Sequence, residues 1–74
     1  MHIIIVGCGK VGRTLAEQLQ EEEIDLTLID TVEKTVNDVT EDIDAMGIVG
    51  NGASINTLME AGISTADILI AVTA

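Results

Sequence analysis

The sequence predicts an α/β fold built on a doubly wound, parallel β-sheet. Short apolar segments rich in Ile, Val and Leu alternate with segments of helical periodicity, and strands joined by crossover helices run parallel. A glycine-rich hexapeptide, residues 7–12, separates the first apolar segment from the first helical one. Aromatic residues are absent (0%), so the core must be aliphatic, as is typical of buried parallel strands covered by helices.

The first strand is expected at His2–Val6, where four consecutive β-branched residues are followed by a glycine. A helix is expected from residue 10 to about residue 22, with a buried face made of Val11, Leu15, Ala16 and Leu19. The acidic run at residues 21–23 is unfavourable at the negative end of a helix dipole, so the end of this helix should fray. The second strand is expected at Asp25–Asp30, followed by a helix whose apolar face consists of Val32, Val36, Val39 and Ile43.

The third strand is expected at residues 45–49. A third helix should lie between an N-cap at Ser54 and a terminating glycine at Gly62, with the apolar residues Ile55, Leu58 and Met59. The fourth strand is expected at residues 68–72. The strand order 3-2-1-4 normally continues to about six strands. We therefore expect residues 1–74 to be part of a longer domain whose C-terminal strands are missing, because the fourth strand would otherwise be an unprotected apolar edge.

The composition argues against several classes of function. Thirteen acidic residues and three basic ones give a net charge of −10, which is unfavourable for binding nucleic acid or anionic lipid. The single cysteine, Cys8, cannot form an internal disulfide, which fits a reducing compartment. No apolar run approaches the ~20 residues that span a bilayer.

Residues 7–12 fit the pattern G-x-G-x-x-G in the context of a Rossmann-type dinucleotide site. The segment follows an expected strand, opens an expected helix, and is followed eighteen residues later by Asp30 at the end of the next strand. Gly7 would allow the tight turn, Gly9 would let backbone N–H groups approach the pyrophosphate, and Gly12 would let the helix pack closely. The alternative is a glycine turn without a ligand. We expect the cofactor to be bound by Gly7, Cys8, Gly9, Lys10, Val11 and Gly12.

Asp30 is expected to accept hydrogen bonds from ribose hydroxyls and to repel a 2′-phosphate, which favours NAD(H) or an adenine mononucleotide over NADP. The alternative is an acidic strand end that faces solvent. Lys10 and Arg13 place positive charge beside the glycine loop, and Arg13 is the better candidate for a phosphate contact. The alternative is a pair of solvated cations.

Two further segments should reach the same edge of the sheet. Asn51, in the glycine-rich segment 50–54, is expected to hydrogen-bond near the adenine, the alternative being an ordinary turn before a helix. Thr73 is expected to reach a ribose or phosphate at the end of the fourth strand. Cys8 is interpreted as a small residue at a variable position, with a reactive thiolate as the alternative. No catalytic residue and no metal site are indicated, since His2 has no partner at ligand spacing.

Several segments together carry a family resemblance: residues 1–12, Leu28-Ile29-Asp30, residues 50–54, and residues 58–63 leading to residues 66–73. With them the whole chain resembles the N-terminal nucleotide-binding domain of Trk-type potassium-uptake regulators, the TrkA-N or RCK (regulator of potassium conductance) family. By position, the resemblance implies a nucleotide site lined by Gly7, Gly9, Gly12, Arg13, Asp30, Asn51 and Thr73.

The resemblance also implies a function. Such proteins are cytoplasmic, bind NAD(H) or ATP/ADP, assemble through dimers into rings, and dock on a membrane potassium transporter or channel subunit whose activity follows nucleotide exchange. We therefore expect a nucleotide-sensing regulatory subunit of a potassium transport system, peripheral to the inner face of the membrane, rather than an enzyme. The alternative is the cofactor-binding half of an NAD-dependent oxidoreductase whose catalytic residues lie in other sequence.

Overall fold

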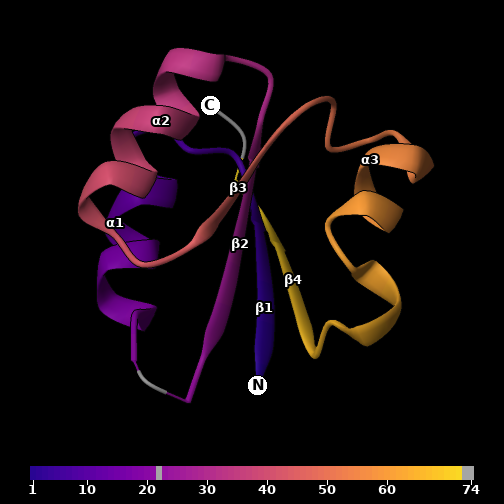
Figure 1. Cartoon of the computed structure of the whole chain (residues 1–74), viewed down its shortest axis with the longest axis horizontal. Helices are drawn as coiled ribbons and strands as arrows, with labels where there is room; N and C mark the ends of the chain where they lie inside the picture. The colour runs from indigo at the N-terminus through magenta and orange to yellow at the C-terminus, as the bar shows by residue number, and fades with distance from the viewer. Residues whose placement is uncertain (22, 73–74) are drawn as a thin grey trace.

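A central parallel β-sheet lies between helices in the computed structural model, which describes residues 1–21 and 23–72 (Figure 1). Within these residues the sheet has four strands in the predicted order, β3-β2-β1-β4. All neighbouring strands are parallel. The strands are β1 (His2–Val6), β2 (Asp25–Asp30), β3 (Met46–Val49) and β4 (Ile68–Ala71). The predicted Rossmann-like, doubly wound α/β class is therefore confirmed.

Helices cover both faces of the sheet, which Figure 1 shows nearly edge-on. The helices are α1 (Lys10–Leu19), α2 (Glu33–Asp42), α3 (Ile55–Glu60) and the short 3-10 helix η1 (Ile63–Thr65). The face with α1 and α2 has the larger buried cluster, which includes Ile3 and Ile5 of β1. Ile4, between them, belongs to a smaller cluster with Ile29 and Ala61 on the side of α3 and η1. This alternation explains why β1 is apolar at successive positions: both of its faces are buried.

The first helix is shorter than predicted. α1 ends at Leu19, and Gln20 already has an extended backbone. The last turn has no basic residue that could offset the acidic residues that follow, which is unfavourable at the negative end of the helix dipole. Val11 was expected on the buried face but is 59% exposed. Ala16 is buried as predicted, Leu15 and Leu19 pack against the core, and Gly12 rather than Val11 is the other buried position.

The structure corrects two further expectations, one about an apolar face and one about a helix cap. Val32 precedes α2 as its N-cap and is exposed, whereas Val36, Val39 and Ile43 are buried as predicted. α3 begins after Ser54 as predicted, but in the described structure the Ser54 hydroxyl makes no capping hydrogen bond.

Only part of the apolar side of α3 packs against the sheet. Leu58 packs against the smaller cluster, while Ile55 and Met59 are exposed. Gly62 has the left-handed conformation (φ 88°) expected of a terminating glycine. Among the described residues, no helix is both long and apolar enough to cross a membrane.

Asp67, just before β4, forms two hydrogen bonds with His2 at the start of β1. Its Oδ2 accepts the backbone N–H of His2 at 2.8 Å, and the Asp67 N–H donates to the His2 carbonyl at 2.8 Å. Asp67→Ala is expected to lower the free energy of unfolding by about 1 kcal/mol, because one hydrogen bond to a charged but exposed acceptor is lost. Urea unfolding measures this loss. Asp67→Asn, which keeps an acceptor oxygen, should lose less, and equal losses in both variants would contradict the assignment.

Candidate functional site

Three loops meet at the carboxyl edge of the sheet: the glycine loop after β1, the β2–α2 connection and the β3–α3 connection. The register pairs Val6 of β1 with Ile29 of β2 and with Ala71 of β4, so these three strands end at the same level. Backbone hydrogen bonds then join the loops: the Gly7 N–H donates to the Ile29 carbonyl at 2.7 Å, and the Gly50 N–H donates to the Asp30 carbonyl at 2.9 Å. The edge is therefore a fixed frame for whatever binds there.

Each glycine of the loop has a different environment. Gly7 turns the chain with φ 107°, and a Cβ there would lie 2.2 Å from the Val72 carbonyl oxygen. A Cβ on Gly12 would lie 1.8 Å from the Gly7 carbonyl oxygen, so only glycine lets α1 start this close to the loop. A Cβ on Gly9 would have no described neighbour within 4 Å. Gly7 and Gly12 are thus required by packing, whereas Gly9 faces open space.

The N-terminus of α1 provides hydrogen-bond donors at this open position. Gly9 is the N-cap residue, and its carbonyl accepts the Arg13 N–H at 2.8 Å. The N–H groups of the first turn have no partner within a helix, and they carry the positive end of the helix dipole. Together with the space beside Gly9, they form an arrangement suited to a phosphate group.

The Asp30 side chain lies directly opposite the loop. Its Oδ2 accepts the backbone N–H of Cys8 at 2.8 Å, and its Oδ1 accepts the N–H of Val32 at 3.0 Å. The carboxylate is therefore not simply a solvated strand end. It links the glycine loop to the start of α2, which sequence reasoning did not foresee because the residues are far apart in the chain.

The Cys8 thiol is buried behind the loop. Its Sγ lies 3.8 Å from the Ile29 carbonyl oxygen, and the residue is 3% exposed. Burial, and secondly the negative charge of Asp30, raise the pKa of the Cys8 thiol to about 11. The thiol is therefore protonated at neutral pH, which favours the interpretation of Cys8 as a packing residue over a reactive thiolate.

Thiol labelling tests this state of Cys8. A pKa of about 11 instead of 9.0 leaves about a hundredfold less thiolate at pH 7, and burial slows access further. The folded protein should therefore react with Ellman's reagent at least about a hundredfold more slowly than the same protein unfolded in urea. Because Cys8 is the single cysteine, the signal has one source. Similar rates in both states would show an accessible thiol.

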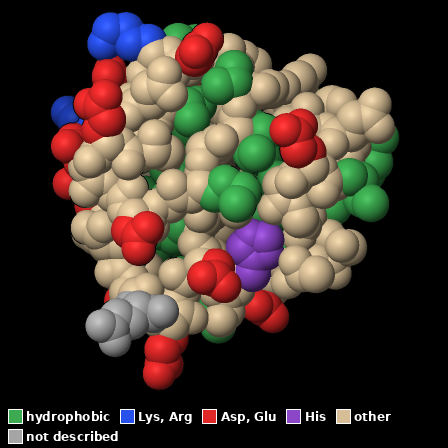
Figure 2. All heavy atoms as spheres, in the orientation of Figure 1, with side chains coloured by type: hydrophobic (Ala, Val, Ile, Leu, Met, Phe, Trp, Pro, Cys, Tyr) green, Lys and Arg blue, Asp and Glu red, His purple; other side chains and the backbone are tan. Residues whose placement is uncertain are grey.

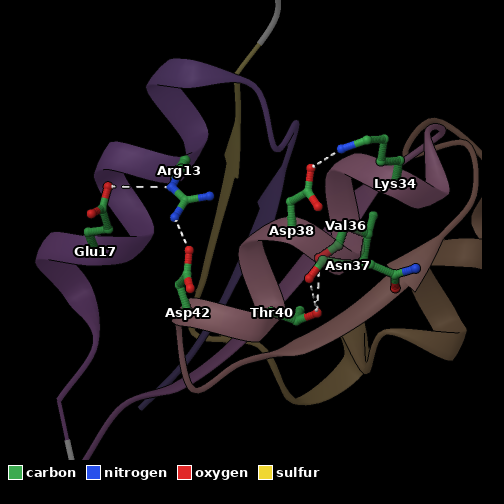
Figure 3. A network of polar contacts seen from close by, with 8 residues as sticks. All are labelled: Arg13, Glu17, Lys34, Val36, Asn37, Asp38, Thr40 and Asp42. Carbon is green, nitrogen blue, oxygen red and sulfur yellow. Dashed lines mark hydrogen bonds and ion pairs between the residues drawn. The ribbon is translucent and has the colours of Figure 1, made fainter.

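The two basic side chains near the loop have different surroundings. The Arg13 guanidinium pairs with Asp42 at the end of α2 and lies 3.9 Å from Glu17 of α1 (Figure 3). In the described structure the Arg13 guanidinium thus contacts carboxylates, while Lys10 beside the loop is exposed. Figure 2 shows acidic side chains scattered across the visible face and basic ones at its upper left. The N-terminus of α1 therefore provides positive potential at Gly9 that does not depend on the Arg13 guanidinium.

A cavity of about 500 Å³ adjoins the loop on the α3 side of the sheet. Asn51 and Asp30 line it together with Gly7, and its apolar wall includes Val6, Ile29 and Leu69. The Asn51 Oδ1 accepts the Ala53 N–H at 2.8 Å, and among the described residues the side-chain N–H groups of Asn51 remain for a ligand. The apolar wall could have been predicted from the sequence, because alternate residues of a strand face the same side of the sheet and the strand ends are apolar. Thr73 lies outside the described residues.

A second cavity, of about 770 Å³, lies at the opposite end of the strands. Its lining includes His2 and the acidic residues Glu21, Asp25, Asp44, Glu60 and Asp67. Although larger, it lies away from the glycine loop. Among the described residues, no cluster of His, Cys, Asp or Glu could hold a metal ion.

Comparisons with known proteins agree with this geometry. The chain is 40% identical to the Trk system potassium uptake protein TrkA of Azorhizobium caulinodans over 73 residues, which cover 99% of this chain and 16% of that protein. It is 44% identical to a Trk system potassium uptake protein TrkA homolog of Methanothermobacter thermautotrophicus over 73 residues, covering 99% of this chain and 34% of that one. The chain thus spans between about a sixth and a third of the length of these relatives.

A solved structure is similar as well. The Shewanella denitrificans Kef CTD in its AMP-bound form superposes with a TM-score of 0.81 at 25% identity, covering 100% of this chain and 44% of that chain. The TrkA-N domain family matches residues 3–74. The match includes the glycine loop, Asp30 and the segment after β3, and the chain therefore belongs to the TrkA-N domain family.

Proposed function

We propose that this chain is the nucleotide-binding part of a regulatory subunit of a potassium transport system. Its ligand is NAD(H) or an adenine nucleotide such as ATP, ADP or AMP, bound at residues 7–13 with Asp30, Asn51 and Thr73. The observation that carries the proposal is the open space at Gly9, bounded by the N-terminus of α1 and lying across the loop from Asp30. Donors for a phosphate and an acceptor for ribose hydroxyls are thus presented together.

The relatives support a regulatory role over the alternative of an oxidoreductase half. The similar proteins carry the name of a potassium uptake protein, and the similar Kef CTD structure contains AMP. In the proposed mechanism the nucleotide binds one conformation of the full protein more tightly than another, which shifts their equilibrium. The partner is a membrane potassium transporter or channel subunit. The protein acts as a cytoplasmic homo-oligomer held at the membrane through that partner, with residues 1–74 as part of its nucleotide-binding domain.

Thermal unfolding with different nucleotides tests the binding site. NADH, NAD⁺, ATP, ADP, AMP and NADPH are compared, each well above its Kd. A ligand at 100 times its Kd should add about 2.7 kcal/mol to the free energy of unfolding, if it binds only the folded state. NADH or an adenine nucleotide should stabilise the protein, and NADPH should not, because Asp30 repels a 2′-phosphate. No stabilisation of a folded sample by any of them would refute the proposal.

A further inference from the structure

The Asp30 carboxylate contacts the protein itself at the place where a ribose is expected. Its Oδ2 and Oδ1 accept the N–H groups of Cys8 and Val32, and the Asp30 carbonyl accepts the N–H of Gly50. Asp30 is thus bonded to all three loops that border the cavity: the glycine loop, the β2–α2 connection and the β3–α3 connection. A residue in this position affects the shape of the site before any ligand enters.

The middle of the glycine loop depends on this carboxylate. Gly7 is fixed by its bond to Ile29, and Gly9 is fixed from the other side by the Arg13 N–H. Between them, Cys8 has the 2.8 Å bond from its N–H to Asp30 and a 3.8 Å contact from its sulfur to the Ile29 carbonyl. A hydrogen bond to a carboxylate is roughly twice as strong as a neutral one, and a thiol is a weak donor. Asp30 is therefore the stronger anchor of Cys8.

We propose that Asp30 is a positioning residue for phosphate binding: by holding the Cys8 N–H, it keeps the glycine loop in the conformation that receives the phosphate. This inference rests on the proposed function and extends it. Its consequence is that nucleotides without ribose hydroxyls also depend on Asp30.

The loop contact and a ribose contact are compatible. A carboxylate has about four lone-pair sites. The two backbone N–H groups occupy one on each oxygen, which leaves about two for the hydroxyls of a vicinal diol. Ribose binding therefore does not require the loop to be released, and the two contributions of Asp30 to affinity should add.

Two ligands that differ only in their ribose hydroxyls distinguish the loop contact of Asp30 from its ribose contact. We would measure the affinity of the protein and of Asp30→Ala for AMP and for 2′,3′-dideoxy-AMP. Loss of the loop anchor should weaken the dideoxy ligand about tenfold or more, and AMP by a larger factor. Removing a negative charge near a phosphate would by itself increase affinity, so electrostatics cannot produce this decrease. An unchanged or increased affinity for the dideoxy ligand, with AMP weakened, would reduce Asp30 to a ribose contact and overturn the proposal.

Asp25→Ala is the matched control. Asp25 lies on the same strand at its other end, is exposed, and carries the same charge. This variant should bind both ligands as the unmodified protein does. Circular dichroism and urea unfolding establish that each variant is folded. If the unmodified protein binds neither AMP nor any other nucleotide, the proposed function fails, and the next measurement still decides on the loop.

Labelling of Cys8 without ligand reports the loop directly. Asp30→Ala and Asp30→Asn both remove the charge that helps to raise the pKa of Cys8, but Asn keeps a carbonyl oxygen that can accept the Cys8 N–H. If Asp30 holds the loop, the thiol of Asp30→Ala should react several-fold faster than that of Asp30→Asn. Equal rates in the two folded variants would show that the hydrogen bond does not position the loop.

Discussion

Gly12→Ala is expected to destabilise the protein by about 2–3 kcal/mol. The new Cβ would lie 1.8 Å from the Gly7 carbonyl oxygen and 2.9 Å from its carbon, and both are backbone atoms that cannot rotate away. Overpacking typically costs about 1–3 kcal/mol and occasionally more, and contacts this short with backbone atoms put the cost at about 3–4 kcal/mol. Alanine favours a helix over glycine by up to about 1 kcal/mol, which offsets only part of a clash this severe.

Thermal unfolding measures the effect of Gly12→Ala. For a chain of this size, 1 kcal/mol shifts Tm by about 4–8 °C, so a decrease of about 10–20 °C is expected. Nucleotide affinity should also fall, because α1 must move away from the loop. A variant with the Tm of the unmodified protein would show that α1 does not pack on Gly7 as described.

Gly9→Val is expected to have the opposite profile: nucleotide binding is lost while the fold is kept. Gly9 has φ −69° and ψ −167°, an extended conformation that valine adopts readily, and its Cβ would meet no described atom within 4 Å. The stability cost is limited to the poorer N-cap, about 1 kcal/mol or less. The side chain would fill the space proposed for the phosphate, so affinity should fall at least about a hundredfold.

Calorimetric titration with AMP or NADH measures this loss, and Gly9→Ala provides a graded comparison. Alanine adds one methyl group to the same space and should weaken binding less than valine does. Unchanged affinity in Gly9→Val would mean that the phosphate does not bind at Gly9. Together, the Gly12 and Gly9 variants separate glycines that packing requires from a glycine that the ligand requires.

The sequence predicted the strands because their signals are local, and it predicted their order because the glycine loop indicates a fold of known topology. β1, with Ile3, Ile4 and Ile5 buried on alternating faces, has the β-branched apolar pattern that is typical of a strand between two helical layers. The glycine loop could likewise be predicted with its separate roles, since Gly7 and Gly12 act within a few residues of each other.

The errors arose where a residue's environment depends on distant partners. Val11 and Val32 fit helical periodicity, but each lies at the start of a helix and is exposed. Val11 is beside Gly12, which takes the buried position of α1, and Val32 is the N-cap residue of α2. The phosphate contact of Arg13 stays a prediction, for which the sequence shows only that Arg13 lies near the loop. Its pairing with Asp42 depends on how α1 and α2 pack (Figure 3). The bond between Asp30 and Cys8 was missed for the same reason.

The unequal clusters on the two faces of the sheet imply a hierarchy of local opening. α3 has no buried residue among those described, whereas α1 and α2 each contribute two. Segments with few buried contacts unfold locally at lower free energy than the global transition. Amide protons of α3 should therefore exchange with solvent before those of α1 and α2. Asn51 is joined to α3 through the short segment that follows it, so we expect this side of the cavity to open at lower free energy than the side formed by the glycine loop and α1.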